Sequence, residues 1–274
     1  TYMDMRTFKE GMGEKVILDL NENYFVPREL MYRLLLEVAE ECDPRRYPQH
    51  EELELRSAIS QYLRVPADCV VLGNGSNQLI HLIVQAFLRE GDEAISITPT
   101  FSIYQYCVNL QNARYIGIPL KQDFSLDVDQ ILKAVSEKTK LIFLSSPNNP
   151  TANQFKKEDI LTVLENFPGL VVIDEAYVEF SDQPSMIAHI HEFENLVVLR
   201  SFSKTFGMAG LRLGYAISSE KLAYALRRLL LPFNVNAVTL RMGVKILRRV
   251  DLVKATINRL KEERERLIRG LNGI

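Results

Sequence analysis

The chain has 274 residues, 47% of them apolar, and a formal net charge of −2, which allows one large α/β domain or a large domain plus a smaller one. The near-neutral charge, without a basic stripe, argues against a nucleic-acid partner. No apolar run is long enough to span a bilayer, and the N-terminal residues lack the basic start and apolar region of a signal peptide. Three widely spaced cysteines, Cys42, Cys69 and Cys107, predict neither a zinc site nor disulfides. We therefore expect a cytoplasmic protein with reduced thiols and no metal.

Helices and short apolar runs follow one another along the chain. Val16 to Leu20 predicts a short edge strand, and the next residues to Pro27 predict a loop. Apolar spacing then predicts helices over residues 28–41, 51–63, 78–89, 102–111, 127–135 and 156–166. Buried strands are predicted over residues 69–72, 94–97, 114–118, 141–144, 170–173, 196–199 and 213–217. Residues 251–271 predict a long, charged, mostly solvated helix.

Apolar strands separated by helices predict a mostly parallel sheet covered on both faces. Ligands of such sheets bind beyond the carboxyl ends of the strands. Residues with useful chemistry follow the predicted strands repeatedly, at Gly75-Ser76-Asn77, Phe101, Asn149, Asp174 and Lys204. This coincidence predicts one shared site at that edge of the sheet.

Lys204 is the candidate nucleophile. It follows a buried strand and stands among hydroxyl residues, with Arg212 eight positions on. A nearby positive charge lowers the pKa of a lysine and makes imine formation possible. A surface lysine in a loop is the ordinary alternative. In the company of the other strand-end residues, we favour a lysine that carries pyridoxal 5′-phosphate (PLP) as a Schiff base.

Asp174 ends a buried strand, where a carboxylate needs a partner. A protonated pyridine nitrogen is the recurring partner in PLP sites, and Tyr177, three residues on, is within reach of the ring oxygen. A metal ligand or a helix cap is the alternative for Asp174, and Glu175 beside it keeps the metal alternative open.

Gly75-Ser76-Asn77 opens a buried helix, whose N-terminal N–H groups suit a phosphate. Ser201, Ser203 and Arg212 would complete a phosphate cup, although a plain serine-rich turn is the alternative. Position 78 is Gln78, so the dinucleotide-binding pattern GxGxxG is incomplete.

Asn149 and Phe101 each allow two interpretations. The Asn149 amide can donate to a ring oxygen or form a turn. The Phe101 ring can stack on a flat cofactor or fill the core.

Three motifs together resemble a known family: SSPNNPT (Ser145 to Thr151), VVIDEAY (Val171 to Tyr177) and SFSKTFGMAGLRLGY (Ser201 to Tyr215). Their order and spacing resemble the fold-type I PLP-dependent aminotransferases, closest to the histidinol-phosphate aminotransferases. LNEN (Leu20 to Asn23) and RYP (Arg46 to Pro48) also resemble that branch. The resemblance implies a three-layer α/β/α sandwich with a mostly parallel, seven-stranded sheet. It also implies an N-terminal arm over residues 1–24, a large PLP-binding domain over 25–236 and interdomain helices over 237–274.

The resemblance implies a role for each candidate residue. Lys204 would form the internal aldimine and shuttle a proton, Asp174 would pair with the pyridine nitrogen, and Tyr177 would bind the ring oxygen with Asn149. The implied phosphate ligands are Gly75, Ser76, Asn77, Ser201, Ser203 and Arg212. Phe101 would stack on the ring, with Tyr104 as the alternative. In a homodimer with shared sites, Tyr47 would reach the cofactor phosphate of the partner subunit. The Asn149–Pro150 bond is expected to be cis.

The chain departs from the family pattern in three places. Ala152 stands where the family has glycine, and Tyr24 stands where it has proline. The family's small C-terminal domain, with the arginine that binds the substrate carboxylate, is not found before Ile274, so we expect a C-terminally truncated chain.

The resemblance implies a function in amino-acid biosynthesis, specifically that of histidine. The predicted activity is PLP-dependent transamination between an amino donor, histidinol phosphate or an aromatic amino acid, and a 2-oxo acid. One alternative is a decarboxylase of the same branch acting on threonine phosphate. The other is a catalytically dead PLP-binding or dimerisation module.

Overall fold

The computed structural model describes residues 19–272. Most of the predicted edge strand at Val16 to Leu20 lies outside the described residues, and Asp19 and Leu20 form a bend. The helices are α1 (Arg28–Glu41), α2 (Glu51–Leu63), α3 (Ser76–Phe87), α4 (Ile103–Leu110), α5 (Val128–Lys133), α6 (Lys157–Asn166), α7 (Glu220–Leu229), α8 (Ala237–Leu247) and α9 (Val250–Leu271). The strands are β1 (Val70–Gly73), β2 (Glu93–Thr98), β3 (Arg114–Pro119), β4 (Thr139–Ser145), β5 (Leu170–Asp174), β6 (Leu196–Ser201) and β7 (Gly214–Ser218). Short 3₁₀ helices follow β5 (Val178–Phe180) and precede β7 (Ala209–Leu211).

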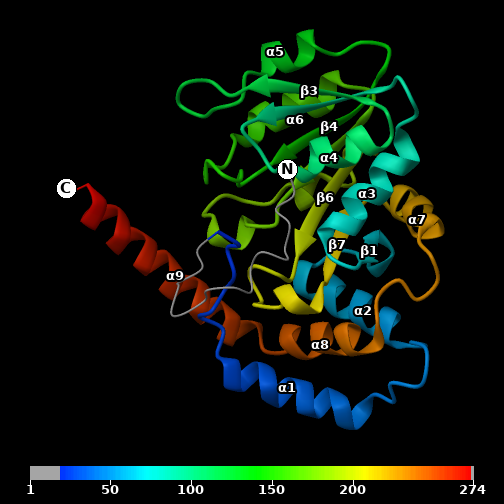
Figure 1. Cartoon of the computed structure of the whole chain (residues 1–274), viewed down its shortest axis with the longest axis vertical. Coiled ribbons are helices and arrows are strands. Elements are labelled where there is room, and N and C mark those ends of the chain that lie inside the picture. The colour runs from blue at the N-terminus through cyan, green and yellow to red at the C-terminus, as the bar shows by residue number, and fades with distance from the viewer. Residues whose placement is uncertain (1–18, 273–274) are drawn as a thin grey trace, which may run out of the picture.

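The strands form one sheet of seven in the order β1-β7-β6-β5-β4-β2-β3. Strands β2 to β6 pair in parallel, and β7 runs antiparallel to both of its neighbours, β1 and β6. The prediction of a seven-stranded, mostly parallel sheet is therefore confirmed. Because parallel strands share a direction, their carboxyl ends meet at one edge of the sheet (Figure 1).

Both faces of the sheet are buried. In β5, Val171 and Ile173 belong to one apolar core, and Leu170 and Val172 belong to the other. Side chains of α3, α4 and α7 fill the second core, and side chains of the other helices fill the first. Successive residues of a strand point to opposite faces, so a strand buried on both sides must be apolar throughout. This explains the uninterrupted apolar runs in the sequence.

Two helices depart from the sequence-based expectation. Helix α3 begins at Ser76 rather than Gln78, because Gly75 takes a positive φ of 79° at its N-cap and the helix starts directly after it. Helix α7 was not predicted at all. Its signal was present: Ser219 caps the helix by accepting from the Leu222 N–H group, and Arg227 lies in its last turn. The domain boundaries stay predictions.

A buried ion cluster ties the chain after β5 to β6. Arg200 of β6 is 5% exposed and donates to Glu175 at 2.9 Å and to Glu179 at 2.7 Å. Glu175 also accepts from the Ser185 hydroxyl at 2.6 Å and from the Met186 N–H group at 2.7 Å. Burial raises the pKa of Glu175, and the Arg200 charge opposes that rise. The cluster therefore fixes the two chain segments that leave the centre of the sheet.

Cys42, Cys69 and Cys107 are free and buried, and burial raises the pKa of Cys107 to about 11. Among the described helices, none combines the length and the apolar character needed to cross a membrane.

The ion cluster predicts a large stability loss in Arg200→Met. This change leaves Glu175 and Glu179 buried without their cation, so the free energy of unfolding should fall by about 3–5 kcal/mol in denaturant titration. Lys221→Met is the matched control, because Lys221 pairs with Glu194 at 3.3 Å while both side chains are largely exposed, and it should change stability by less than about 1 kcal/mol. Equal small losses in the two variants would contradict the structural importance of the cluster.

The backbone at Ala152 predicts a substitution that increases stability. Its φ of 60° lies in the left-handed region, which an alanine side chain disfavours and glycine does not. We expect Ala152→Gly to raise the free energy of unfolding by about 1 kcal/mol. Ala39→Gly, on the exposed side of helix α1, should lower it by a similar amount. A loss in both variants would show that the Ala152 backbone carries no strain.

Candidate active site

A cavity of about 320 Å³ opens at the carboxyl edge of the parallel strands. Its volume is in the range of sites for small molecules. It is lined by Asp19, Leu20, Asn21, Glu22, Ser76, Asn77, Phe101, Ser145, Asn149, Asp174, Ala176, Tyr177, Ser201, Ser203, Lys204, Ala209 and Arg212. Every candidate residue from the sequence except Gly75, Tyr47 and the alternative stacking residue Tyr104 is in this lining.

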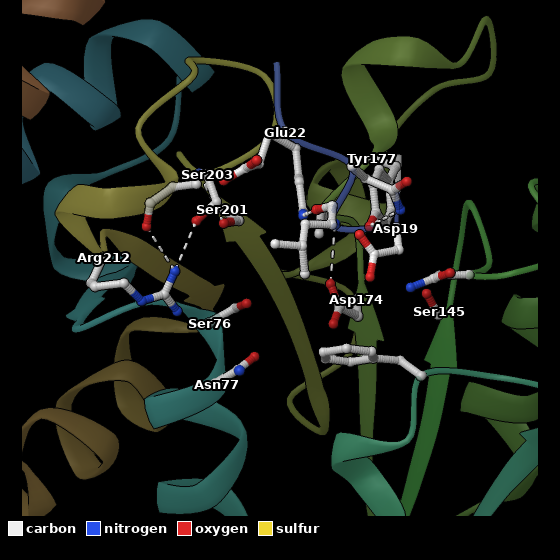
Figure 2. Close-up of a pocket in the computed structure, with 17 residues that line it drawn as sticks. Asp19, Glu22, Ser76, Asn77, Ser145, Asp174, Tyr177, Ser201, Ser203 and Arg212 are labelled. Atoms are coloured by element: carbon white, nitrogen blue, oxygen red, sulfur yellow. Dashed lines mark hydrogen bonds between the residues drawn. The ribbon is translucent and has the colours of Figure 1, made fainter. Parts of the chain in front are cut away.

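The lining divides into two sides (Figure 2). Ser76, Asn77, Ser201, Ser203 and Arg212 gather on one side, where hydroxyl, amide and guanidinium groups face the cavity. On the opposite side, Asp174 and Tyr177 lie with Ser145. The cavity thus offers donors for an anion at one end and a carboxylate at the other.

Asp174 ends β5 and is 4% exposed. One carboxylate oxygen accepts from the Tyr104 hydroxyl at 2.9 Å, and the other accepts from the Ala176 N–H group at 3.0 Å. Burial raises the pKa of Asp174 to about 6, against the effect of both hydrogen bonds. Asp174 is therefore a carboxylate that gains from a cationic partner in the cavity.

Glu175 does not join Asp174 at the cavity. It is held by Arg200 on the other side of the chain, and the described residues contain no group of three or more His, Cys, Asp or Glu side chains placed to hold a metal.

The two aromatic candidates for stacking separate clearly. Phe101 lines the cavity, whereas Tyr104 is fully buried and does not. Tyr104 stacks instead on Phe143, with the ring centroids 5.0 Å apart and the planes at 8°. Tyr104 as the alternative stacking residue is therefore wrong, because its ring is enclosed in the core between α4 and the sheet.

Lys204 points into the cavity from the segment after β6. Its Nζ donates to the Leu20 carbonyl oxygen and lies 5.9 Å from the centre of the Tyr177 ring. Burial lowers the pKa of Lys204; Glu22 opposes this shift and Arg212 adds to it. The sequence had assigned the lowering to Arg212, whereas burial is the main cause. A lower pKa leaves more of the amine uncharged and nucleophilic.

Tyr177 is held by Asn21, whose amide donates to the Tyr177 hydroxyl oxygen at 3.2 Å. Burial raises the pKa of Tyr177, so the phenol stays protonated near neutral pH. The N-terminal stretch of the chain therefore reaches back over 156 positions to orient a residue of the cavity.

Close packing at two glycines, Gly75 and Gly214, accompanies the entry of the Arg212 side chain into the cavity. Arg212 Nη1 donates to the Ser203 hydroxyl oxygen at 3.3 Å and to the Ala209 carbonyl oxygen at 3.1 Å. Gly75 does not line the cavity, but a Cβ there would lie 2.5 Å from Arg212 Nη2. A Cβ at Gly214 would overlap the backbone nitrogen of Ser76. Space therefore requires glycine at position 214, where the clash is with backbone, whereas at position 75 the φ of 79° favours glycine.

Two loops meet beside Asn149. The buried Asn148 side chain accepts from the Thr100 hydroxyl at 2.8 Å and donates to the Pro99 carbonyl oxygen at 3.0 Å. It joins the loop after β2, with Phe101, to the loop after β4, with Asn149. The Asn149–Pro150 bond is cis, as predicted.

Tyr47 lies away from this cavity. It is 74% exposed and stacks on Phe233, with the ring centroids 4.7 Å apart. Its contact with a partner subunit stays a prediction.

Several lining residues were not singled out as ligands from the sequence: Asp19, Leu20, Asn21, Glu22, Ser145, Ala176 and Ala209. Ser145 had a usable signal, because it ends β4 next to Asp174 in the sheet register. The LNEN stretch had been noted only through the family resemblance, since its polar residues read locally as an ordinary loop.

A second, wider cavity of about 790 Å³ adjoins the first and shares with it Asp19, Asn21, Glu22, Asn149, Tyr177 and Lys204. Its outer wall includes Lys261 and Arg264 of α9. Lys261 is paired with Asp182 at 2.6 Å, and Arg264 approaches the Phe180 carbonyl oxygen at 3.5 Å. The Lys204 amine therefore faces a larger space that is also lined by two cations.

Comparisons with known proteins identify the family of this chain. Residues 14–274 match the family described as aminotransferase class I and II. The histidinol-phosphate aminotransferase of Bacteroides fragilis is 36% identical over 265 residues, which cover 96% of this chain and 72% of that protein. The corresponding protein of a Thermoanaerobacter species is 37% identical over 258 residues, covering 94% of this chain and 73% of the relative.

Solved structures share the fold. The histidinol-phosphate aminotransferase of Sinorhizobium meliloti, crystallised in complex with pyridoxal-5′-phosphate, superposes with a TM-score of 0.83 at 24% identity, covering 90% of this chain and 68% of that one. The histidinol-phosphate aminotransferase of Clostridium acetobutylicum gives 0.83 at 24% identity, covering 93% and 76%. On the family match across nearly its whole length, the chain belongs to the aminotransferase class I and II family.

Proposed function

We propose that this chain binds PLP and transfers the amino group of histidinol phosphate, or of an aromatic amino acid, to a 2-oxo acid. The observation that carries the proposal is a single cavity in which an amine of lowered pKa, Lys204, and a buried carboxylate, Asp174, lie with a cluster of anion donors. The names of the relatives at 36–37% identity support histidinol phosphate as the donor.

The residues present fit PLP at each of its polar groups. Asp174 suits the protonated ring nitrogen, because a cation there offsets the cost of burying the carboxylate. Tyr177 and Asn149 line the cavity near Asp174 and suit the ring oxygen. Ser76, Asn77, Ser201, Ser203 and Arg212 suit the phosphate, with Arg212 supplying charge and the first turn of α3 supplying N–H groups.

When bound, PLP supplies an aldehyde that condenses with amines and a pyridine ring that accepts electrons from the substrate Cα. The chain supplies the groups that control this chemistry. Lys204 offers an amine that burial keeps partly uncharged, which can take the proton from the substrate Cα and return it. Asp174 would hold the proton on the ring nitrogen, and the Phe101 side chain would limit water on the ring face.

The wider cavity supports a donor with a second anionic group. Lys261 and Arg264 line the same wider cavity as Lys204, and cations in that cavity suit the phosphate of histidinol phosphate. An aromatic amino acid would leave both cations without a substrate partner.

Two alternatives stay open. A decarboxylase of the same branch, acting on threonine phosphate, would release carbon dioxide rather than pass its amino group to a 2-oxo acid. A catalytically dead module would bind PLP without turnover of any donor. Product analysis with each donor and 2-oxoglutarate separates the three. A homodimer that places Tyr47 at the partner's site and a cytoplasmic location also remain proposals.

Lys204→Ala tests cofactor attachment. Wild-type protein mixed with PLP should develop a visible absorbance band, and borohydride should then fix the added mass on the peptide that contains Lys204. In Lys204→Ala both signals should disappear, and transamination should fall at least about 10²-fold with the loss of the proton-transfer group. Lys221→Ala, far more exposed, should retain both. A colourless wild type at saturating PLP would refute the proposal.

Arg264→Gln tests the donor. The variant loses one charged hydrogen bond to a substrate phosphate, so KM for histidinol phosphate should rise by about tenfold, while KM for an aromatic amino acid should change little. Arg269→Gln, on an exposed part of α9 outside both cavities, is the matched control. Equal effects on both donors would exclude phosphate recognition by Arg264.

A further inference from the structure

We propose that Tyr104 is a positioning residue for Asp174: its hydroxyl keeps the Asp174 carboxylate ionised and aimed at the cofactor ring nitrogen. This inference rests on the proposed function, since it gives Asp174 the ring nitrogen as its partner. Tyr104 touches neither the cavity nor, by this proposal, the substrate, so it acts only through Asp174.

Tyr104 provides one of two hydrogen bonds that fix the Asp174 carboxylate. Tyr104 is 0% exposed and donates to Asp174 Oδ2 at 2.9 Å, while the Ala176 N–H group donates to Oδ1 at 3.0 Å. Two donors, one on each oxygen, prevent the carboxylate from rotating. The Tyr104 bond comes from α4, which packs on the face of the sheet that carries Leu170 and Val172, and the Ala176 bond comes from the chain directly after β5.

The Tyr104 ring is itself fixed on two sides. It lies nearly parallel to the Phe143 ring of β4, with centroids 5.0 Å apart. The Phe101 ring, which lines the cavity, lies nearly perpendicular to the Tyr104 ring, with the planes at 85° and the centroids 5.7 Å apart. Tyr104 therefore contacts both Asp174 and Phe101, the two side chains that we place next to the cofactor ring. It sets the position of one relative to the other.

The hydrogen bond from the Tyr104 hydroxyl favours the ionised form of Asp174. Burial raises the pKa of Asp174, and Tyr104 is the first group that opposes this rise. The other titratable side chains that line the cavity with Asp174 are Asp19, Glu22, Tyr177, Lys204 and Arg212. Glu175, the next residue, points away to Arg200, although its charge adds to the rise in the pKa of Asp174. Burial also raises the pKa of Tyr104 well above its ordinary value. The phenol thus stays protonated and acts only as a donor to Asp174.

The first experiment needs no cofactor. The carboxyl pKa of Asp174 is measured by NMR titration of apo protein carrying ¹³C-labelled aspartate, with Asp174→Asn identifying the signal. In Tyr104→Phe the pKa of Asp174 should rise by about one unit, since one hydrogen bond to the charged form is lost. The phenylalanine ring keeps both aromatic contacts, so the variant should fold.

Tyr115→Phe is the matched control. Tyr115 is a partly buried tyrosine, and its hydroxyl donates to the Ile97 carbonyl oxygen at 3.5 Å rather than to Asp174. Its loss should leave the Asp174 signal unchanged. An unchanged pKa of Asp174 in Tyr104→Phe, or an equal shift in both variants, would overturn the proposal.

The second experiment uses PLP and the visible absorbance band. The PLP concentration at half saturation should rise about fivefold in Tyr104→Phe at pH 6, where a one-unit shift removes most of the ionised Asp174, and change little at pH 8.5. In the Asp174→Asn background, Tyr104→Phe should have no further effect at either pH. A tyrosine that only supported the fold would weaken binding equally at both pH values and in both backgrounds. If wild-type protein binds no PLP, the proposed function fails, and the apo titration still tests Tyr104.

Discussion

The buried contact between Arg200 and its two glutamates is the constraint on which the site depends. Strands β5 and β6 lie side by side at the centre of the sheet, and each ends in a segment that carries a functional group, Tyr177 or Lys204. The Glu179 carboxylate accepts from Arg200 and, at 2.8 Å, from the hydroxyl of Thr205, the neighbour of Lys204. Because these charges are buried, any rearrangement that separates them leaves a desolvated ion. The two segments therefore keep one relative position.

The same low-polarity surroundings explain why the two ionisable groups of the cavity differ from their ordinary behaviour. Burial penalises the charged form of both, so it raises the pKa of Asp174 and lowers that of Lys204. Each group then gains from a ligand of complementary character: a cation at the acid and a carbonyl carbon at the amine. A single physical cause thus prepares both ends of the cavity for one kind of ring.

The sequence predicted the parts of this arrangement that follow from local pattern. Apolar runs such as Val171 to Ile173 identified the buried strands, and the residues after them identified most of the cavity lining, since parallel strands end at one edge. Tyr104 could not be placed in the same way. Its spacing in α4 shows that it is buried, but its contact with Asp174 joins residues 70 positions apart. The sequence-based prediction omitted helix α7, although its capping residue was present. Burial lowers the pKa of Lys204 more than Arg212 does, and that could be seen only from the three-dimensional surroundings of the amine.

The position of β7 has a consequence for biosynthesis. Among the described strands, β1 pairs only with β7, and Val70 is the partner of Ile217. Strand β1 can therefore join the sheet only once β7 is in place. Helix α3, which directly follows β1, carries Ser76 and Asn77. A ribosome-bound chain that has not yet released residues 214–218 can assemble the five parallel strands and still lack one wall of the cavity. Cofactor capture therefore has to follow the pairing of β1 with β7, the most distant strand pairing among the described residues.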